Sequence, residues 1–162
     1  MTLHELQKLF PDATESTWHQ HPNGGGWVEN TANVDASAFV GPRARVYGNA
    51  WVSGDARVYG DAGVFGHAQV FGHAQVSGHA RMYGNALVYG DAGVYGDAGV
   101  FGHAQVSGHA RVYGNAWVFG NALVYGDAGV FGNARVFGNA WVHGNTEVYG
   151  YTWVSGDARV AE

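Results

Sequence analysis

A six-residue period runs through almost the whole chain and restricts its fold more than any other feature. Counting every sixth residue from Val34 to Val160 gives 22 positions, of which 21 are valine and one is Met82. Alanine stands two places before these residues except at Thr146 and Thr152, and glycine stands two places after most of them. A strict short repeat of this kind is the signature of a solenoid, in which each unit buries its apolar face against its neighbours.

Each repeat has the pattern of a short strand followed by a corner. Alternate side chains of a strand lie on opposite faces, so Ala-x-Val places the alanine and the valine inward and the variable residues outward. The Gly-Asn, Gly-Asp or Gly-His that follows indicates a turn, because these residue types tolerate a positive φ. We therefore expect positive φ at the corner Asn, Asp and His residues too. Three repeats per turn would make a triangular coil of 18 residues, and 22/3 gives just over seven coils.

The repeated residues carry a resemblance to a known family. The run Val46–Val58 resembles the hexapeptide-repeat proteins, whose fold is the left-handed parallel β-helix. Residues 24–28 and 38–44 further resemble the YdcK-type β-solenoids, a group labelled as transferases. The left hand and the three-sided section are implied by this resemblance, which covers residues 27–160. We expect an all-β protein with three hexapeptides per coil and about seven coils.

Residues 1–33 differ from the rest and are predicted to form an N-terminal cap and lead-in to the β-helix of residues 34–162. Pro11 ends a run of four apolar residues with the spacing of a short amphipathic helix. These four are Leu3, Leu6, Leu9 and Phe10. We expect the helix to cover the open strand edges of the first coil. Residues 16–26 are predicted to be a loop, with Trp18 as a candidate plug.

Composition excludes several classes of function. The formal net charge is −5, with only 8 lysines and arginines, so no basic patch favours nucleic acid. No segment has the length of a membrane span, and the first residues lack the form of a signal peptide. The chain has no cysteine, which removes disulfides and thiolate chemistry. We expect a cytoplasmic protein that binds neither nucleic acid nor membranes.

Taking every eighteenth residue sorts the outward positions by face. One face carries six consecutive rings: Tyr47, Phe65, Tyr83, Phe101, Phe119 and Phe137. Trp117 and Trp153 stand beside them, among arginines and glycines. A second face carries Tyr59, Ser77, Tyr95, Tyr113, Phe131 and Tyr149, and the third carries Ser53, Phe71, Tyr89, Ser107, Tyr125 and His143. Large apolar patches are rarely left in water, so the six-ring face is predicted to bind protein. Aromatic residues also favour such ladders without any partner, and ring stacking on a carbohydrate or other ligand is a third interpretation.

The histidines raise the question of metal binding. Five of them occupy corner positions: His67, His73, His79, His103 and His109. Zinc needs three or four convergent donors, whereas corner residues point away from the core, so no metal site is predicted. His19 and His21, in a glycine-rich segment, are candidates for binding a metal or an anion, although such a segment more often only turns the chain.

An acyltransferase is the alternative that the resemblance implies. Hexapeptide acyltransferases are usually trimeric, with a general-base histidine in the cleft between subunits and an acyl-CoA donor. His143, which faces outward on a strand beside Trp141, is the first candidate for such a base, and His109 is the second. Those enzymes commonly interrupt their repeats with a projecting loop and carry a C-terminal helix, and this chain has neither.

We therefore predict a non-catalytic rigid scaffold or binding solenoid without a cofactor. It would self-associate or bind a protein partner through the six rings, Trp117 and Trp153. The chain stops two residues after Val160 without a capping helix, so we expect a second molecule to cover the last coil. A homo-oligomer is expected, either a trimer or an end-to-end dimer. The alternative function is acyl transfer from acyl-CoA at a site between subunits.

Overall fold

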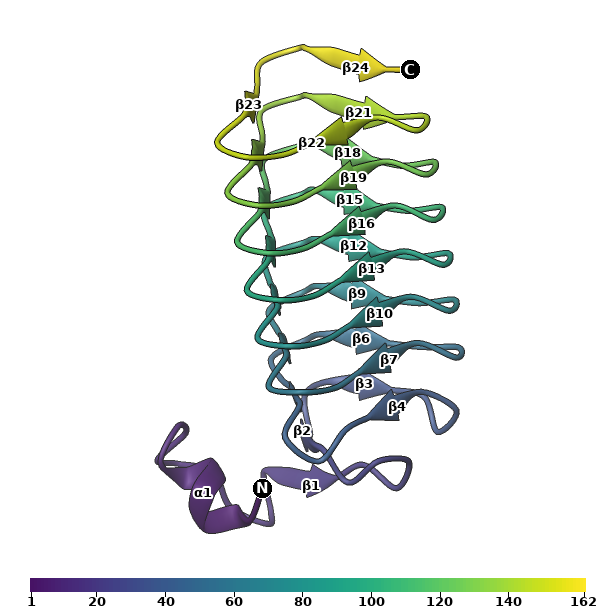
Figure 1. Ribbon diagram of the computed structural model, residues 1–162. Helices are drawn as coiled ribbons and strands as arrows, with labels where there is room; N and C mark the ends of the chain where they lie inside the picture. Colours follow the sequence, from purple (N-terminus) through teal and green to yellow (C-terminus); the bar gives the residue numbers. More distant parts are fainter.

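The computed structural model describes all 162 residues and shows a three-sided parallel β-solenoid of about eight turns. Three sheets, here called A, B and C, form its sides. In Figure 1 the chain rises from sheet A on the left to sheet B behind and then to sheet C in front, so the coil is left-handed. The predicted fold, an all-β left-handed parallel β-helix with a helical N-terminal cap, is confirmed.

Each coil contributes one short strand to each sheet. Sheet A contains β1 (Trp18–Gln20), β2 (Trp27–Glu29), β5 (Arg45–Val46), β8 (Gly63–Val64), β11 (Arg81–Met82), β14 (Gly99–Val100), β17 (Trp117–Val118), β20 (Arg135–Val136) and β23 (Trp153–Val154). Sheet B contains β3 (Asn33–Val34), β6 (Trp51–Val52), β9 (Gln69–Val70), β12 (Leu87–Val88), β15 (Gln105–Val106), β18 (Leu123–Val124), β21 (Trp141–His143) and β24 (Arg159–Ala161). Sheet C contains β4 (Phe39–Val40), β7 (Arg57–Val58), β10 (Gln75–Val76), β13 (Gly93–Val94), β16 (Arg111–Val112), β19 (Gly129–Val130) and β22 (Glu147–Val148).

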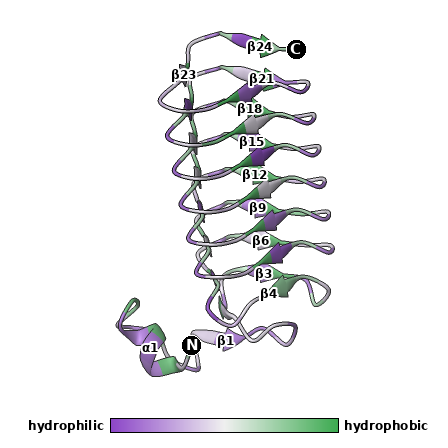
Figure 2. Ribbon diagram, viewed as in Figure 1, coloured by the Kyte–Doolittle hydropathy of each residue, from purple (hydrophilic) through white to green (hydrophobic).

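The core is a column of valine and alanine inside the coil. One cluster of 39 buried residues runs from Val28 to Val154, and Met82 fits within it at 0% exposure. Strands pair in parallel in steps of 18 residues, so equivalent residues of successive coils stack on each other, as Val46 does on Val64. Figure 2 shows hydrophobic and hydrophilic residues alternating along the coils. Because β2 already pairs in parallel with β5, coiling begins one repeat before Val34, and the resulting 23 repeats make about eight turns.

From Gly48 onward, the corners depend on glycine. The repeat glycines from Gly48 to Gly156 have φ between 66° and 74°, and no other residue type has a positive φ. The expectation of positive φ at the corner Asn, Asp and His residues is therefore wrong, because from Gly48 onward the preceding glycine takes the left-handed conformation. A Cβ added to Gly96 would lie 3.0 Å from the backbone nitrogen of Gly114, so stacked corners leave no room for a side chain.

A short helix opens the N-terminal cap. Helix α1 (Leu3–Gln7) begins with a capping box between Thr2 and Glu5. The bond from the Thr2 backbone N–H lowers the pKa of the Glu5 carboxyl. The predicted helix is confirmed but ends earlier than expected, which leaves Leu9 outside it and 53% exposed. With five residues it is the only helix, and no helix here is long and apolar enough to cross a membrane.

The rest of the cap closes the N-terminal end of sheet A. The predicted loop contains β1, which pairs antiparallel with β2, so the loop prediction is wrong at Trp18–Gln20. Trp18 is 5% exposed and packs in a cluster with Leu6, Ala13 and Trp27, as a plug would. These contacts cover the strand edge at which the first coil would otherwise be open.

Candidate functional site

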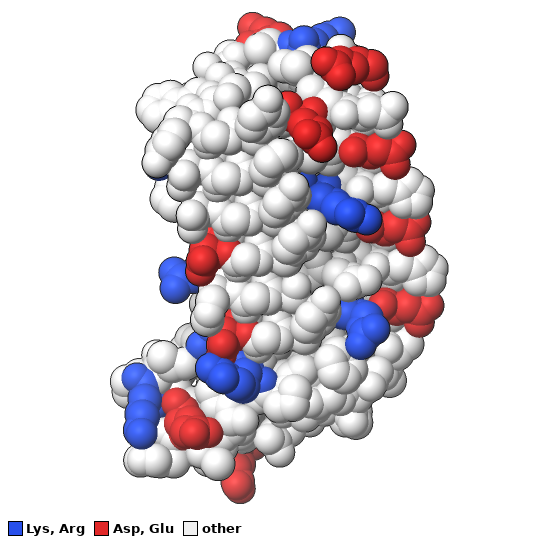
Figure 3. Space-filling model, viewed as in Figure 1, with Lys and Arg blue, Asp and Glu red and all other residues white.

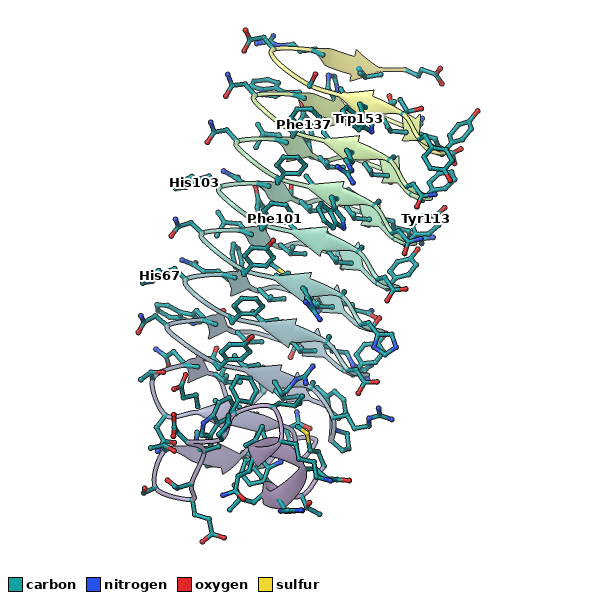
Figure 4. All side chains as sticks on the ribbon, turned by 90° about the vertical axis from the view of Figure 1, so that its left-hand side faces the viewer. His67, Phe101, His103, Tyr113, Phe137 and Trp153 are labelled. Atoms are coloured by element: carbon teal, nitrogen blue, oxygen red, sulfur yellow. The ribbon has the colours of Figure 1, made fainter.

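Sheet A carries a continuous ladder of six stacked rings. All six predicted residues, from Tyr47 to Phe137, lie in one column along the axis, where Figure 4 labels Phe101 and Phe137. Neighbouring ring centroids are 4.7–5.1 Å apart and the planes differ by only 3–9°. The strand spacing sets this distance. Each ring is half-buried, because its neighbours cover its two faces.

The ladder continues into the cap at its N-terminal end. The Phe10 ring stands edge-on to Tyr47 with centroids 4.9 Å apart, and Trp18 lies 6.0 Å from the same ring. Burial under these residues raises the pKa of Tyr47. The cap therefore fixes the first ring of the ladder.

Beside the ladder, the second outward column of sheet A changes character along the axis. Its C-terminal half contains Trp117, Arg135 and Trp153. The Arg135 guanidinium lies 4.9 Å and 5.5 Å from the two indole centroids, within the range of cation–π attraction. Both indoles stand at 77° to ladder rings, and they are 41% and 63% exposed. This half of the face is apolar and projects from the sheet.

The N-terminal half of the same column is hollowed. Gly63 and Gly99 alternate there with arginines, and a hollow of about 440 Å³ lies over Gly99. Arg81, Asp97 and Trp117 are among the residues that line it. In Figure 3 the outline of this left-hand side curves inward between the cap and the upper coils.

The ring columns of the other two sheets are interrupted. On sheet C, the rings from Tyr95 to Tyr149 stack at 4.8–5.4 Å, but Ser77 separates them from Tyr59. Figure 4 labels Tyr113, a member of this column. On sheet B, Ser107 interrupts the column in the same way. Of the three faces, only sheet A presents an unbroken ladder.

Sheet C also has two hollows, and sequence reasoning missed them. One of about 400 Å³ lies over Gly93, and one of about 280 Å³ lies over Gly129. Arg111 lines both hollows, together with Asp91 in the first and Asp127 in the second. Figure 3 shows acidic side chains along the right-hand edge of this face, with basic side chains beside them. The signal for the two hollows is Asp-Ala-Gly-Val, which begins at Asp91 and Asp127 on sheet C. The same segment begins at Asp97 below the hollow on sheet A.

The two candidate catalytic histidines lie in different surroundings. The His143 imidazole, on β21 of sheet B, stacks on Tyr125 with centroids 4.9 Å apart and is half-buried. His109 is an exposed corner residue whose Nδ1 lies 3.7 Å from a carboxylate oxygen of Asp91. It lines the hollow over Gly129, which His143 does not. The structure does not bring the two imidazoles into one site.

The remaining histidines do not converge either. His67 and His103 project outward from one edge of the coil in Figure 4. Near the cap, His19 contacts the side chain of Asn30, whereas the buried ring of His21 contacts the backbone of Asp35. No group of three or more His, Asp or Glu side chains is arranged to hold a metal ion.

Four segments of the chain match the family described as the YdcK beta solenoid repeat. They are residues 44–60, 80–96, 104–119 and 128–144. The matched segments lie within the stacked coils and contribute strands to all three sheets. No curated protein matches the chain.

Proposed function

Because this chain is a YdcK-type β-solenoid, we propose that it is a non-catalytic, rigid binding rod that self-associates through sheet A. The observation that carries the proposal is the exposure of Trp117 and Trp153 beside an unbroken stack of rings. Tryptophan and arginine are enriched among the residues that contribute most to protein interfaces. A fully packed core holds these side chains in fixed positions, which lowers the entropic cost of binding.

The distribution of charge supports a second copy as the partner. The formal charge of −5 makes two chains repel each other. Between Phe101 and Trp153, the outward strand positions of sheet A hold no carboxylate and one arginine, Arg135. Contact through this half therefore brings the fewest like charges together. In a two-fold pair the same patch serves both partners.

The test is the absolute mass in solution, measured by light scattering at two protein concentrations. We expect the wild-type mass to be a multiple of 17.2 kDa, and the double variant Trp117→Ser/Trp153→Ser to be monomeric. Trp51→Ser is the matched control, because Trp51 is 48% exposed but lies on sheet B. A double variant with the wild-type mass would exclude this face as the contact. A wild-type monomer at both concentrations would exclude self-association.

Acyl transfer remains the competing function. It would require a cleft between subunits that presents His143 or His109 to an acyl-CoA donor. A ligand that binds only the folded protein raises its melting temperature, so a thermal-shift titration with acetyl-CoA tests this function directly. We expect no shift. A saturable shift that His143→Ala or His109→Ala abolishes would overturn the non-catalytic proposal.

The cysteine-free composition supports a cytoplasmic location, which is part of the proposal.

A further inference from the structure

The ring column of sheet C lacks one ring, at Ser77. Strand β10 pairs in register with β7 on one side and with β13 on the other, which places Ser77 between Tyr59 and Tyr95. The two tyrosines are therefore two strand spacings apart, roughly 9.6 Å. Further along the column, one ring occupies each spacing of 4.8–5.4 Å. The slot over Ser77 thus has the height of one flat ring, and both tyrosines line the hollow there.

The side of this slot is open at Gly93, although the fold does not require a glycine at this position. A Cβ added to Gly93 would meet only the ring of Tyr95, at 3.4 Å and 3.6 Å, and φ is not positive there. A Cβ added to the corner residue Gly96 would instead press on the backbone of Gly114. Glycine at position 93 therefore keeps surface space free and is not needed for the turn.

The edge of the slot holds polar groups that are free to bind. The Arg111 side chain makes no hydrogen bond or ion pair within the chain, and Asp91 Oδ2 lies 3.7 Å from His109 Nδ1. The Tyr59 hydroxyl donates to Gln75 Oε1 at 3.1 Å, which leaves the amide N–H groups of Gln75 available. A ligand ring would thus find a carboxylate acceptor and a guanidinium donor at its edge.

Sheet B contains a matched slot that differs at this edge. Residues 72–81 and 102–111 are identical, so Ser107 lies between two tyrosine-bearing coils as Ser77 does. Leu123 and Trp141 occupy the positions that correspond to Gly93 and Arg111. The slot over Ser107 therefore has a filled, apolar edge, and it provides an internal control.

We propose that the slot over Ser77 binds a neutral nucleobase, presented as a nucleoside. Bases stack on aromatic side chains, a carboxylate accepts from an exocyclic amino group, and arginine donates to ring nitrogen and carbonyl acceptors. Guanine, cytosine and adenine each carry such a donor beside an acceptor, and guanine serves here as the probe. Charges of both signs flank the slot, with Arg57 and Arg111 on the face and Asp55 and Asp91 at the corners, so the stacked base carries the recognition. This site is on sheet C and does not depend on self-association through sheet A.

The experiment is equilibrium dialysis of the full chain against guanosine, with cytidine and guanosine monophosphate as comparisons. We expect saturable binding of one guanosine per chain. The variant Ser77→Phe supplies the missing ring and should weaken binding more than tenfold while raising the melting temperature. Ser107→Phe should leave the affinity within twofold of wild type. Wild-type protein that binds neither nucleoside at millimolar concentration would overturn the proposal, as would a Ser77→Phe variant with wild-type affinity.

A second variant tests the polar edge without adding bulk. Asp91→Asn replaces the carboxylate that accepts a hydrogen bond from the amino group of guanine with a neutral amide. It should weaken guanosine binding about tenfold, because the charge-assisted hydrogen bond is lost. Equal affinity of Asp91→Asn and wild type for guanosine would contradict the role assigned to Asp91.

Discussion

Sheets A and C share one core, one coil length and one strand spacing, yet their outer surfaces differ. Sheet A carries six stacked rings without a gap, joined to the cap at Tyr47. Sheet C lacks a ring at Ser77 and has hollows over Gly93 and Gly129. From Val34 onward, the inward positions hold valine and alanine on both sheets except at Met82, Thr146 and Thr152, so the difference between the faces resides in the outward residues. In this molecule the inward positions specify the rod, and the outward positions specify what each face contacts.

The largest effect should come from separating the sheet A ladder from its cap. Trp18→Ala removes a buried indole that packs against Phe10 and Tyr47, and should cost about 3–4 kcal/mol of unfolding free energy. Trp51→Ala, which truncates an exposed indole, should cost less than about 1 kcal/mol. Urea unfolding measures both. Equal losses would mean that the cap adds nothing beyond the coils.

Two glycines of one repeat should respond differently to the same change. Gly96→Ala imposes a positive φ on alanine and presses on the Gly114 backbone, so it should destabilise by about 2–3 kcal/mol. Gly93→Ala, on the face of sheet C, should change stability by less than about 1 kcal/mol. Gly150 also has a positive φ, but a Cβ added there would meet no atom within 4 Å. Gly150→Ala therefore measures the backbone strain without the steric clash. A large loss in Gly93→Ala would show that face glycines also serve the fold.

Removing a ring from sheet A and adding one to sheet C should change the free energy of unfolding in opposite directions. Phe101→Ala removes a ring stacked on both sides and should cost about 2 kcal/mol. Ser77→Phe adds a ring between two others and should gain about 1 kcal/mol. Thermal and urea unfolding report both changes. If Ser77→Phe destabilised the chain, the slot would not have the dimensions of a ring.

The smallest effect should appear at alkaline pH. Burial raises the pKa of Tyr47 on sheet A and of Tyr113 on sheet C above the usual value of about 10. A raised folded pKa gives stability that is present below about pH 10 and is lost as pH rises through the folded value. Tyr47→Phe and Tyr113→Phe should each flatten the fall in stability above pH 10. Unfolding curves at several alkaline pH values test this, and an unchanged slope in both variants would contradict it.

The sequence predicted the rod well because the period acts through the core. Valine and alanine at fixed spacing must face inward together, so the strands followed from counting. The coil of three repeats, and with it the six-ring column, followed from the three-sided section that the family resemblance implied. The corner conformation was predicted wrongly because statistics for Asn, Asp and His could not show that the preceding glycine already supplies the positive φ. The short strand at Trp18–Gln20 was missed because it pairs antiparallel with β2, outside the period.

The candidate site was predicted less completely than the fold. The six rings were identified, but their half-buried state depends on how each ring covers the next, which residue types alone do not give. The hollow over Gly93 on sheet C combines this glycine with Arg111 one coil later and Asp91 at the corner. Three residues separated by up to 20 positions form that edge. They come together only when consecutive coils stack, so the sequence pattern does not show that they are neighbours.

Hydroxyl-radical footprinting tests the separation of the two faces most directly, because it reports each exposed ring in one measurement. As protein concentration rises, we predict protection of Trp117 and Trp153 while Tyr59 and Tyr95 keep their reactivity. Added guanosine should protect the two tyrosines and leave the two tryptophans unchanged. Tryptophans that stay equally reactive at every concentration, or protection that spreads evenly over sheets A and C, would contradict the account.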